Sequence, residues 1–467
     1  MPPRVLPSAL FALLPAALLA QPGAPPPPLR LADALARAER LAVANRGARS
    51  AADAQRAAAL TALRGVLPTA RVDAGYLRTT DPIGVFGTTL RQRQVTPANF
   101  DPARLNFPGA TPNYTGALSI EQPIVNVDAW AGRRSAQHAT RASDANADWT
   151  RVGIHVDVIA AWYGATLANE KARTLESALR AARAHVQQAE AMARNGIVTP
   201  SDAMLAAVKA GEVEAALIEA RGDATTARLA LATVIGTPGD TNFALPDALP
   251  PRARIDALLD APAIVARTET RADLRAAQAM RNAADADVQR TRATYLPRLN
   301  GFARYDWNSA LRPFGGASNW TVGVMASWVP VAGLADWGET RAAAARRAGA
   351  QAMHDGAIAR AQLEIARATT AVAVARARSD IAERAVAQAT DAHRIIGRKY
   401  AGGLAAVSEL LTAAATETQV RLGAAAARHA LIIAAAEHAR AIGNDPARLA
   451  PLDAVADVAL RADTLSH

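Results

Sequence analysis

Residues 296–307, with the sequence LPRLNGFARYDW, alternate between apolar and polar side chains after the initial Leu-Pro pair. Phe302 is the one apolar residue on the polar side of this alternation. After a turn, residues 320–328 (WTVGVMASW) carry tryptophan, valine or alanine at every second position. A period of two residues is typical of a β-strand with one apolar and one polar face. The stretch therefore predicts a β-hairpin with about ten residues in each strand.

The chain contains a second copy of this pattern nearer its N-terminus. Residues 67–76 (LPTARVDAGY) match residues 296–305 at a separation of 229 residues, and residues 114–121 supply the second strand. Farther along, matched residues are 207 positions apart. The matched pairs are Pro123 and Pro330, Trp130 and Trp337, Gly196 and Gly403, Ser201-Asp202 and Ser408-Glu409, and Ile235-Gly236 and Ile442-Gly443. Agreement at well-separated positions predicts an internally duplicated fold.

Helices flank the hairpin in each copy. Each copy opens with an alanine-rich helical stretch, at Leu31–Arg64 and Arg271–Thr294. After each hairpin comes a proline-free stretch, Val127–Arg194 or Asp336–Tyr400, and the first of these would form a helix about 100 Å long. A glycine turn and a shorter returning helix follow, at Ser201–Ile235 and Ala406–Ile442. Helices this long need partner helices along their length.

Two segments lack a regular pattern. The first copy carries 22 more residues between its strands than the second, and its segment Arg78–Asn113 contains five prolines, which predicts a long loop. Between the copies, the proline-rich segment Pro238–Ala266 predicts an irregular connector. The predicted organisation is a signal peptide (1–20), a proline-rich linker (21–28), repeat 1 (29–236), the connector (237–268), repeat 2 (269–443) and a C-terminal tail (444–467).

The composition excludes several classes of protein. The chain has 467 residues and no cysteine, so thiolate chemistry and disulfides are excluded. Its mean hydropathy of +0.02 is too low for a polytopic helical membrane protein. Residues 1–20 combine Arg4, an apolar run and small residues, as in an export signal. The basic residues, nearly all arginine, are spread along the helices without clustering, which argues against nucleic acid as a partner.

No motif for catalysis or nucleotide binding is present, so we expect neither an enzyme nor a cofactor or metal site. Trp162 and Tyr163 are adjacent in a long helix and are interpreted as packing residues. The histidines are scattered and are interpreted as solvated or lumen-facing helix residues. They are His138, His155, His185, His354, His393, His429, His438 and His467.

The four predicted strands describe the wall of a transmembrane barrel, because one face is apolar and the other polar. Four strands cannot close a barrel, whereas three copies of the chain would supply 12. The strands by themselves therefore predict an oligomeric membrane protein, with three copies supplying the strands of one barrel.

The ordered set of motifs resembles the TolC family of bacterial outer-membrane efflux proteins. The matching residues are Leu31-Ala32-Asp33-Ala34-Leu35, Leu67-Pro68, Leu296-Pro297, Ser119-Ile120-Glu121-Gln122-Pro123, Asn195-Gly196-Ile197-Val198-Thr199-Pro200-Ser201-Asp202 and Tyr400-Ala401-Gly402-Gly403. The resemblance implies an α+β membrane protein that forms a homotrimer, with a 12-stranded β-barrel in contact with outer-membrane lipid. It further implies that the long helices continue the barrel as an α-helical barrel, whose tunnel crosses the periplasm. It also implies two partners, a periplasmic adaptor (membrane fusion) protein at the helical tips and an inner-membrane pump.

The two glycine turns are the predicted adaptor-docking tips. Their residues are Gly196, Thr199 and Asp202 in the first turn and Gly403, Val407 and Leu410 in the second. The resemblance places Glu409 in an acidic ring at the periplasmic entrance, and Thr412 stands where some family members have a second acid. The alternative for both Asp202 and Glu409 is an ordinary carboxylate at a helix start, which the helix dipole favours.

Three functions fit these patterns. The first is the exit duct of a multidrug efflux system, and the second is an exit duct for type I protein secretion. The third is a periplasmic coiled-coil adaptor or structural protein, which would need a single helical hairpin beside small β-domains. The sequence instead predicts two hairpins of strands at matching positions, which favours a duct. Neither the exported substrate nor the identity of the adaptor and pump follows from the residues.

Overall fold

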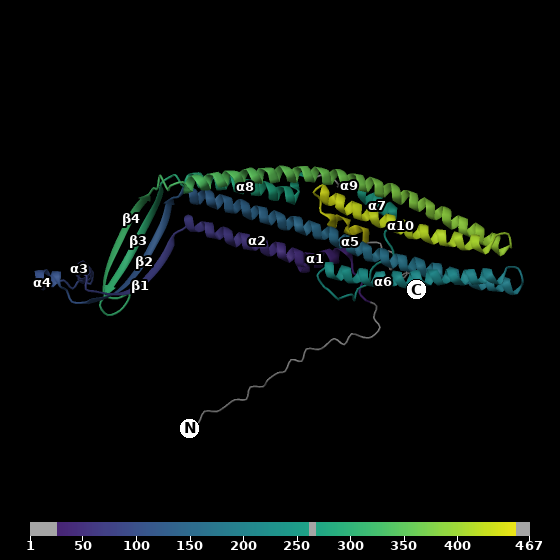
Figure 1. Cartoon of the computed structure of the whole chain (residues 1–467), viewed down its shortest axis with the longest axis horizontal. Coiled ribbons are helices and arrows are strands. Elements are labelled where there is room, and N and C mark those ends of the chain that lie inside the picture. The colour runs from purple at the N-terminus through teal and green to yellow at the C-terminus, as the bar shows by residue number, and fades with distance from the viewer. Residues whose placement is uncertain (1–25, 261–267, 454–467) are drawn as a thin grey trace, which may run out of the picture.

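The computed structural model describes residues 26–260 and 268–453, which form one elongated molecule (Figure 1). A β-sheet lies at one end, and the turns between long helices lie at the other. The predicted signal peptide lies outside the described residues, as do parts of the linker, the connector and the C-terminal tail. None of the helices in the described part of the chain has the length and hydropathy of a membrane-spanning helix.

The sheet contains the four predicted strands in chain order. They are β1 (Thr69–Thr79), β2 (Thr111–Val125), β3 (Arg298–Ser309) and β4 (Ala317–Ser327). All neighbours are antiparallel, and β2 of the first repeat pairs with β3 of the second. The two predicted hairpins are therefore confirmed, and they join side by side into one sheet.

The register places the apolar residues of all four strands on one face. One row across the sheet consists of Val72, Leu118, Tyr305 and Trp320. The next row along each strand carries polar side chains on the opposite face, namely Arg71, Ser119, Arg304 and Thr321. The apolar face is uncovered in the single chain, since Val72 is 65% and Trp320 73% exposed. Such a face requires an apolar environment or a partner.

The segment predicted as a long loop between β1 and β2 is instead partly helical. It contains α3 (Pro82–Arg91), a 3₁₀ turn, η2 (Pro97–Phe100), and α4 (Pro102–Asn106). Proline is tolerated at the first position of a helix, so proline content alone does not exclude helices. Aspartates cap both α-helices: Asp81 accepts a hydrogen bond from the Gly84 amide at 2.6 Å, and Asp101 one from the Ala103 amide at 2.9 Å.

The helices follow the predicted plan closely. The first repeat contributes α1 (Leu31–Leu41), α2 (Val43–Thr61), η1 (Ala62–Gly65), α5 (Val127–Arg194) and α6 (Pro200–Val234). The second contributes η3 (Thr268–Thr270), α8 (Ala272–Ala293), α9 (Ala335–Ala401) and α10 (Val407–Ala441), and the C-terminal tail contributes η4 (Pro446–Asp453). The long helices pair antiparallel with the returning ones, α5 with α6 and α9 with α10 (Figure 1). This arrangement carries the two glycine turns to the end of the molecule opposite the sheet.

Two pairs of glycine turns, each pair separated by 207 residues, share a left-handed backbone conformation. Gly196 and Gly403 have φ angles of 70° and 74°, and Gly236 and Gly443 have φ angles of 86° and 83°. Left-handed φ angles favour glycine, because a Cβ atom is sterically costly there. The duplication seen in the sequence is therefore also a duplication of backbone geometry.

The connector is less irregular than predicted. It contains a helix, α7 (Arg252–Leu259), whose Ile255 is fully buried. Ala244 pairs with the last residues of the proline-rich linker, because its amide donates to the Pro27 carbonyl and its carbonyl accepts from the Leu29 amide, both at 2.9 Å. Burial of an apolar residue and these backbone bonds order a segment that proline content indicated to be irregular.

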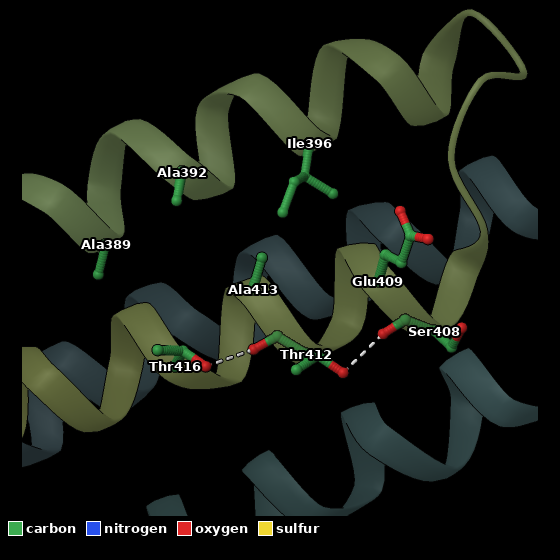
Figure 2. Close-up of a pocket in the computed structure, with 8 residues that line it drawn as sticks. All are labelled: Ala389, Ala392, Ile396, Ser408, Glu409, Thr412, Ala413 and Thr416. Carbon is green, nitrogen blue, oxygen red and sulfur yellow. Dashed lines mark hydrogen bonds between the residues drawn. The ribbon is translucent and has the colours of Figure 1, made fainter.

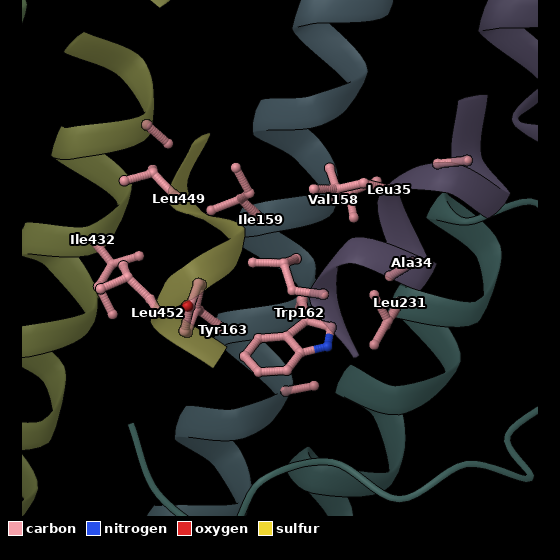
Figure 3. Packing of buried hydrophobic residues seen from close by; sticks show 14 of the residues in the cluster. Ala34, Leu35, Val158, Ile159, Trp162, Tyr163, Leu231, Ile432, Leu449 and Leu452 are labelled. Carbon is pink, nitrogen blue, oxygen red and sulfur yellow. The ribbon is translucent and has the colours of Figure 1, made fainter. Parts of the chain in front are cut away.

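The main hydrophobic core packs around the middle of α5, and Figure 3 shows side chains that belong to it. Trp162 and Tyr163 of α5 lie at its centre, 1% and 0% exposed, with ring centroids 4.7 Å apart. Residues from α1, α6, α10 and η4 surround them, including Leu35, Leu231 and Ile432. Burial raises the pKa of the Tyr163 hydroxyl. The interpretation of this aromatic pair as packing residues agrees with the structure.

One histidine in this region contradicts the prediction of solvated histidines. His155 of α5 is 1% exposed and lies between two carboxylates. Its Nδ1 lies 2.6 Å from Asp445, and its Nε2 lies 2.9 Å from Glu39 of α1. Arg151, one turn earlier on α5, donates to the other oxygen of Asp445 at 3.0 Å. These partners are 116 and 290 residues away from His155 in the sequence, so local patterns gave no sign of them.

Candidate functional site: the helical tips

The two tips are formed by the same backbone hydrogen bonds. In the first, the Ile197 amide donates to the Met192 carbonyl at 2.9 Å. In the second, the Leu404 amide donates to the Lys399 carbonyl at 2.8 Å. Each bond spans five residues and closes a left-handed glycine turn, which is the usual C-terminal cap of a helix. The turns reverse the chain within a few residues, so each returning helix begins close to the point where its long helix ends.

Space around the tip glycines is open. A Cβ atom built on Gly196 or Gly403 would meet no atom within 4 Å. The constraint on these positions is therefore the positive φ angle and not crowding within the chain. An open approach to the backbone suits a surface against which another protein packs closely.

The first tip uses its acidic residue as a helix cap. The carboxylate of Asp202 accepts hydrogen bonds from the Thr199 amide at 3.0 Å and from the Thr199 hydroxyl at 2.8 Å. These bonds satisfy groups at the start of α6 that the helix leaves unpaired. The helix-start alternative for Asp202 accounts for this geometry without a partner protein.

The second tip leaves its acidic residue free. Ala406, at the cap position of α10, has no side chain that can accept a hydrogen bond. Glu409 is exposed and makes no hydrogen bond or ion pair with any residue that the structure describes. Figure 2 shows its side chain pointing from α10 toward α9, near Ile396. The carboxylate lines a groove of about 440 Å³ between these helices.

A second cleft, of about 550 Å³, lies between the two turns. Residues of both predicted docking tips line it, and Glu409 lies at its boundary with the first groove. Its lining residues are Met192, Gly196, Ile197, Val198, Thr199, Asp202, Gly403, Leu404, Ala405, Ala406, Val407 and Glu409. The two turns, 207 residues apart in sequence, therefore form one surface.

Two of the predicted docking residues are buried. Val407 is 4% and Leu410 0% exposed, and both pack in a small core with Tyr400 of α9 and Ala206 of α6. These side chains join the two helical hairpins and are not available for direct contact with a partner. Burial and the nearby Asp202 charge raise the pKa of the Tyr400 hydroxyl. Docking at the tips stays a prediction, in which Val407 and Leu410 would act by fixing the shape of the surface.

Near the tips, the structure also brings together three residues that no sequence pattern had connected. His185 of α5 and His393 of α9 have ring centroids 5.6 Å apart, and Glu417 of α10 lies 2.5 Å from His393. The histidines are 208 positions apart, one more than the repeat separation, so the duplication did not indicate them. Among residues 26–260 and 268–453, no group of three or more potential ligands has the geometry of a metal site.

Comparison with known sequences identifies the family. The sequence profile of the outer membrane efflux proteins matches residues 31–237 and 264–444, which include both repeats. The chain belongs to the outer membrane efflux protein family. This assignment confirms the resemblance noted from the motifs and agrees with the expectation that the chain is not an enzyme. No curated protein sequence matches the chain.

Solved structures share the fold over most of their length. VceC, an outer membrane protein of Vibrio cholerae, is 20% identical, with a TM-score of 0.72 over 89% of this chain and 96% of that one. The CmeC outer membrane channel of Campylobacter jejuni is 15% identical, with a TM-score of 0.70 over 95% and 94%. The open state of the MtrE channel of Neisseria gonorrhoeae is 17% identical, with a TM-score of 0.70 over 90% of each chain. The predicted fold class is therefore that of outer-membrane channels.

Proposed function

We propose that three copies of this chain form an exit duct in the outer membrane and that the duct serves multidrug efflux. The observation that carries this proposal is the open sheet, whose apolar face is exposed while its outer strands, β1 and β4, each have only one neighbour in the described chain. Free strand edges are sites for pairing with another chain. Three sheets joined edge to edge would satisfy the edges and turn the apolar faces toward lipid.

The helical half supports the same assembly. Only five of the 67 residues of α9 are buried, although α9 runs the length of the helical region. Its sequence is rich in alanine, which allows neighbouring helices to approach closely. Helices of two further copies packed along α9 would cover this surface and enclose a tunnel in the periplasm.

The tips are the proposed docking surface for a periplasmic adaptor protein, which would connect the duct to an inner-membrane pump. Both turns expose backbone around a glycine, and a cleft lies between them. The family description as efflux proteins, and the description of CmeC and MtrE as outer membrane channels, support export of small molecules through such a duct. In this proposal, the carboxylate of Glu409 faces the narrow end of the tunnel.

Complementation tests the drug-efflux role directly. The chain would be expressed, with the adaptor and pump encoded in the same genome, in a bacterial strain that lacks its own efflux duct. We expect drug resistance to return and intracellular accumulation of a fluorescent drug to fall. A variant with valine at Gly423, a helical glycine with open space, should behave like the parent. Restored protein secretion without restored resistance would replace multidrug efflux by type I secretion.

A further inference from the structure

A pair of histidines links the two helical hairpins near the tips. His185 lies nine residues before the end of α5 at Arg194, and His393 lies eight residues before the end of α9 at Ala401. Their ring centroids are 5.6 Å apart, with an interplanar angle of 73°. The two side chains come from different hairpins, α5 with α6 and α9 with α10. A ligand held by both rings would therefore join the hairpins to each other.

The orientation of His393 is fixed by a carboxylate. Its Nδ1 lies 2.5 Å from Glu417, which also accepts a hydrogen bond from the Thr390 hydroxyl at 3.0 Å. Arg421 neutralises the same carboxylate at 2.5 Å. Histidines that bind metals commonly donate their other ring N–H to a carboxylate, which fixes the tautomer and raises the basicity of the free nitrogen. Glu417 therefore leaves Nε2 of His393 as the nitrogen available to a ligand.

The other ring has a nitrogen without a partner. His185 Nε2 is buried and makes no hydrogen bond with any described residue. A buried nitrogen without a hydrogen bond loses its interaction with water and gains nothing in return, which is unfavourable. The His185 ring is in contact with the His393 ring, so an ion bound by both rings would give this nitrogen a partner.

We propose that His185 and His393 bind a transition-metal ion, of the Zn²⁺, Cu²⁺ or Ni²⁺ class, between the two hairpins. Imidazole nitrogen is a preferred ligand of these ions. Two imidazoles on one tetrahedral Zn²⁺, with Zn–N distances of about 2.0–2.1 Å, have ring centres roughly 5 Å apart. The observed separation of the ring centroids, 5.6 Å, is close to this value. The protein supplies two ligands, water completes the coordination, and Glu417 is a positioning residue.

The site is independent of the transport proposal, because it needs only the folded helical tips. Calorimetric titration with ZnCl₂ of the full chain in detergent, without an affinity tag, would measure binding. We expect saturable binding of one Zn²⁺ per chain, weakened at least tenfold in His185→Ala and in His393→Ala. Glu417→Gln should weaken binding about 10- to 100-fold, as loss of an outer carboxylate does elsewhere. The matched control is His138→Ala, also on α5, which should bind like the parent.

A spectroscopic measurement guards against variants that lose binding by misfolding. Electron paramagnetic resonance of Cu²⁺ bound to the parent chain should show coupling to two nitrogens, and His185→Gln should reduce this to one. Helix content measured by circular dichroism would verify folding of each variant. The proposal is overturned if the parent binds no Zn²⁺, if both alanine variants bind it like the parent, or if the Cu²⁺ signal shows no pair of nitrogens.

Discussion

The long helix of the first repeat buries 17 of its 68 residues, whereas the equivalent helix of the second repeat buries five of 67. The two helices differ in length by one residue and end in the same kind of turn, but α5 lies inside the folded chain and α9 lies along its outside. The difference appears at single positions too. His155 of α5 is buried between two carboxylates, while its counterpart at the repeat separation, Gln362 of α9, is exposed. Duplication thus preserved the backbone plan, while the two copies took different roles in packing.

The tips show the same divergence in their acidic residues. The carboxylate of Asp202 in the first tip accepts two hydrogen bonds from Thr199. Its counterpart in the second tip, Glu409, makes no hydrogen bond or ion pair with any described residue. A carboxylate bound within its own helix start contributes to stability, and a free one is available to ions or partners. Equivalent positions in a repeat therefore need not have equivalent functions.

The largest expected effect comes from breaking what the repeats share. Valine at Gly196 or at Gly403 would place a β-branched residue at a φ angle near 70°, which costs about 1–2 kcal/mol or more at that residue and opens the turn. We expect drug efflux to be abolished while the assembled protein stays in the membrane. Accumulation of a fluorescent drug and the yield of membrane-extracted oligomer are the measurements. Drug resistance equal to that of the parent would show that the tip turns are not needed for transport. Gly423→Val is the matched control for added side-chain bulk.

The next effect tests the packing difference between the long helices. His155→Ala removes the hydrogen-bonding partner that Asp445 and Glu39 share. Arg151, 3.0 Å from Asp445 and 3.6 Å from Glu39, stays in place and limits the loss. Because both carboxylates are about one-third exposed, we expect a loss of ~2–3 kcal/mol, below the full cost of breaking a buried ion pair. Gln362→Ala should change stability by less than about 0.5 kcal/mol, as exposed substitutions do. Unfolding in detergent, followed by circular dichroism, would compare the two; equal losses would contradict the difference in burial.

Low pH should also reduce stability through the contacts of His155 with Asp445. Burial alone would raise the pKa of Asp445, but hydrogen bonds from His155, the Ala447 amide and Arg151, together with the His155 charge, hold it well below its usual 3.8. The folded state therefore favours the ionised form, and this stabilisation is present above pH 3.8 and lost as the pH falls through the lower, folded value. The unfolding midpoint of the parent should drop more steeply below pH 3.8 than that of Asp445→Asn. Parallel pH profiles would show that the carboxylate contributes nothing at low pH.

The smallest effect concerns the two acidic tip residues. In the proposed trimer, three Glu409 carboxylates approach one axis, where they should favour cations over anions and bind divalent cations. Glu409→Ala should reduce the cation preference of single channels, seen as a shift of reversal potential in a salt gradient, with little loss of stability. Asp202→Ala should instead cost ~1 kcal/mol of stability as a lost cap and leave the reversal potential nearly unchanged. An unchanged reversal potential in Glu409→Ala would leave it as an ordinary helix-start carboxylate.

Much of the fold was predictable because its signals are local or repeated. The two-residue period marked the strands, the absence of proline marked α5 and α9, and the 207-residue separation marked the glycine turns. Proline content wrongly predicted a loop between β1 and β2, because aspartate caps such as Asp81 and Asp101 allow helices to begin there. The strands and the long helices were predicted correctly because each depends mainly on the residues within its own segment.

The site was less predictable because its chemistry depends on contacts between distant segments. The burial of Val407 and Leu410 follows from packing against the other hairpin, which no local pattern encodes. His155 finds its carboxylates on α1 and after α10, and His185 meets His393 across two hairpins. Each of these required the three-dimensional arrangement of helices that are far apart in sequence.

The central claim is that the uncovered sheet and the uncovered face of α9 are covered by two further copies of the chain. The mass of the protein extracted from the outer membrane in mild detergent, measured with the detergent contribution subtracted, tests it most directly. The account predicts a stable particle with three times the mass of one mature chain. A stable single chain that conducts ions in planar bilayers would contradict it.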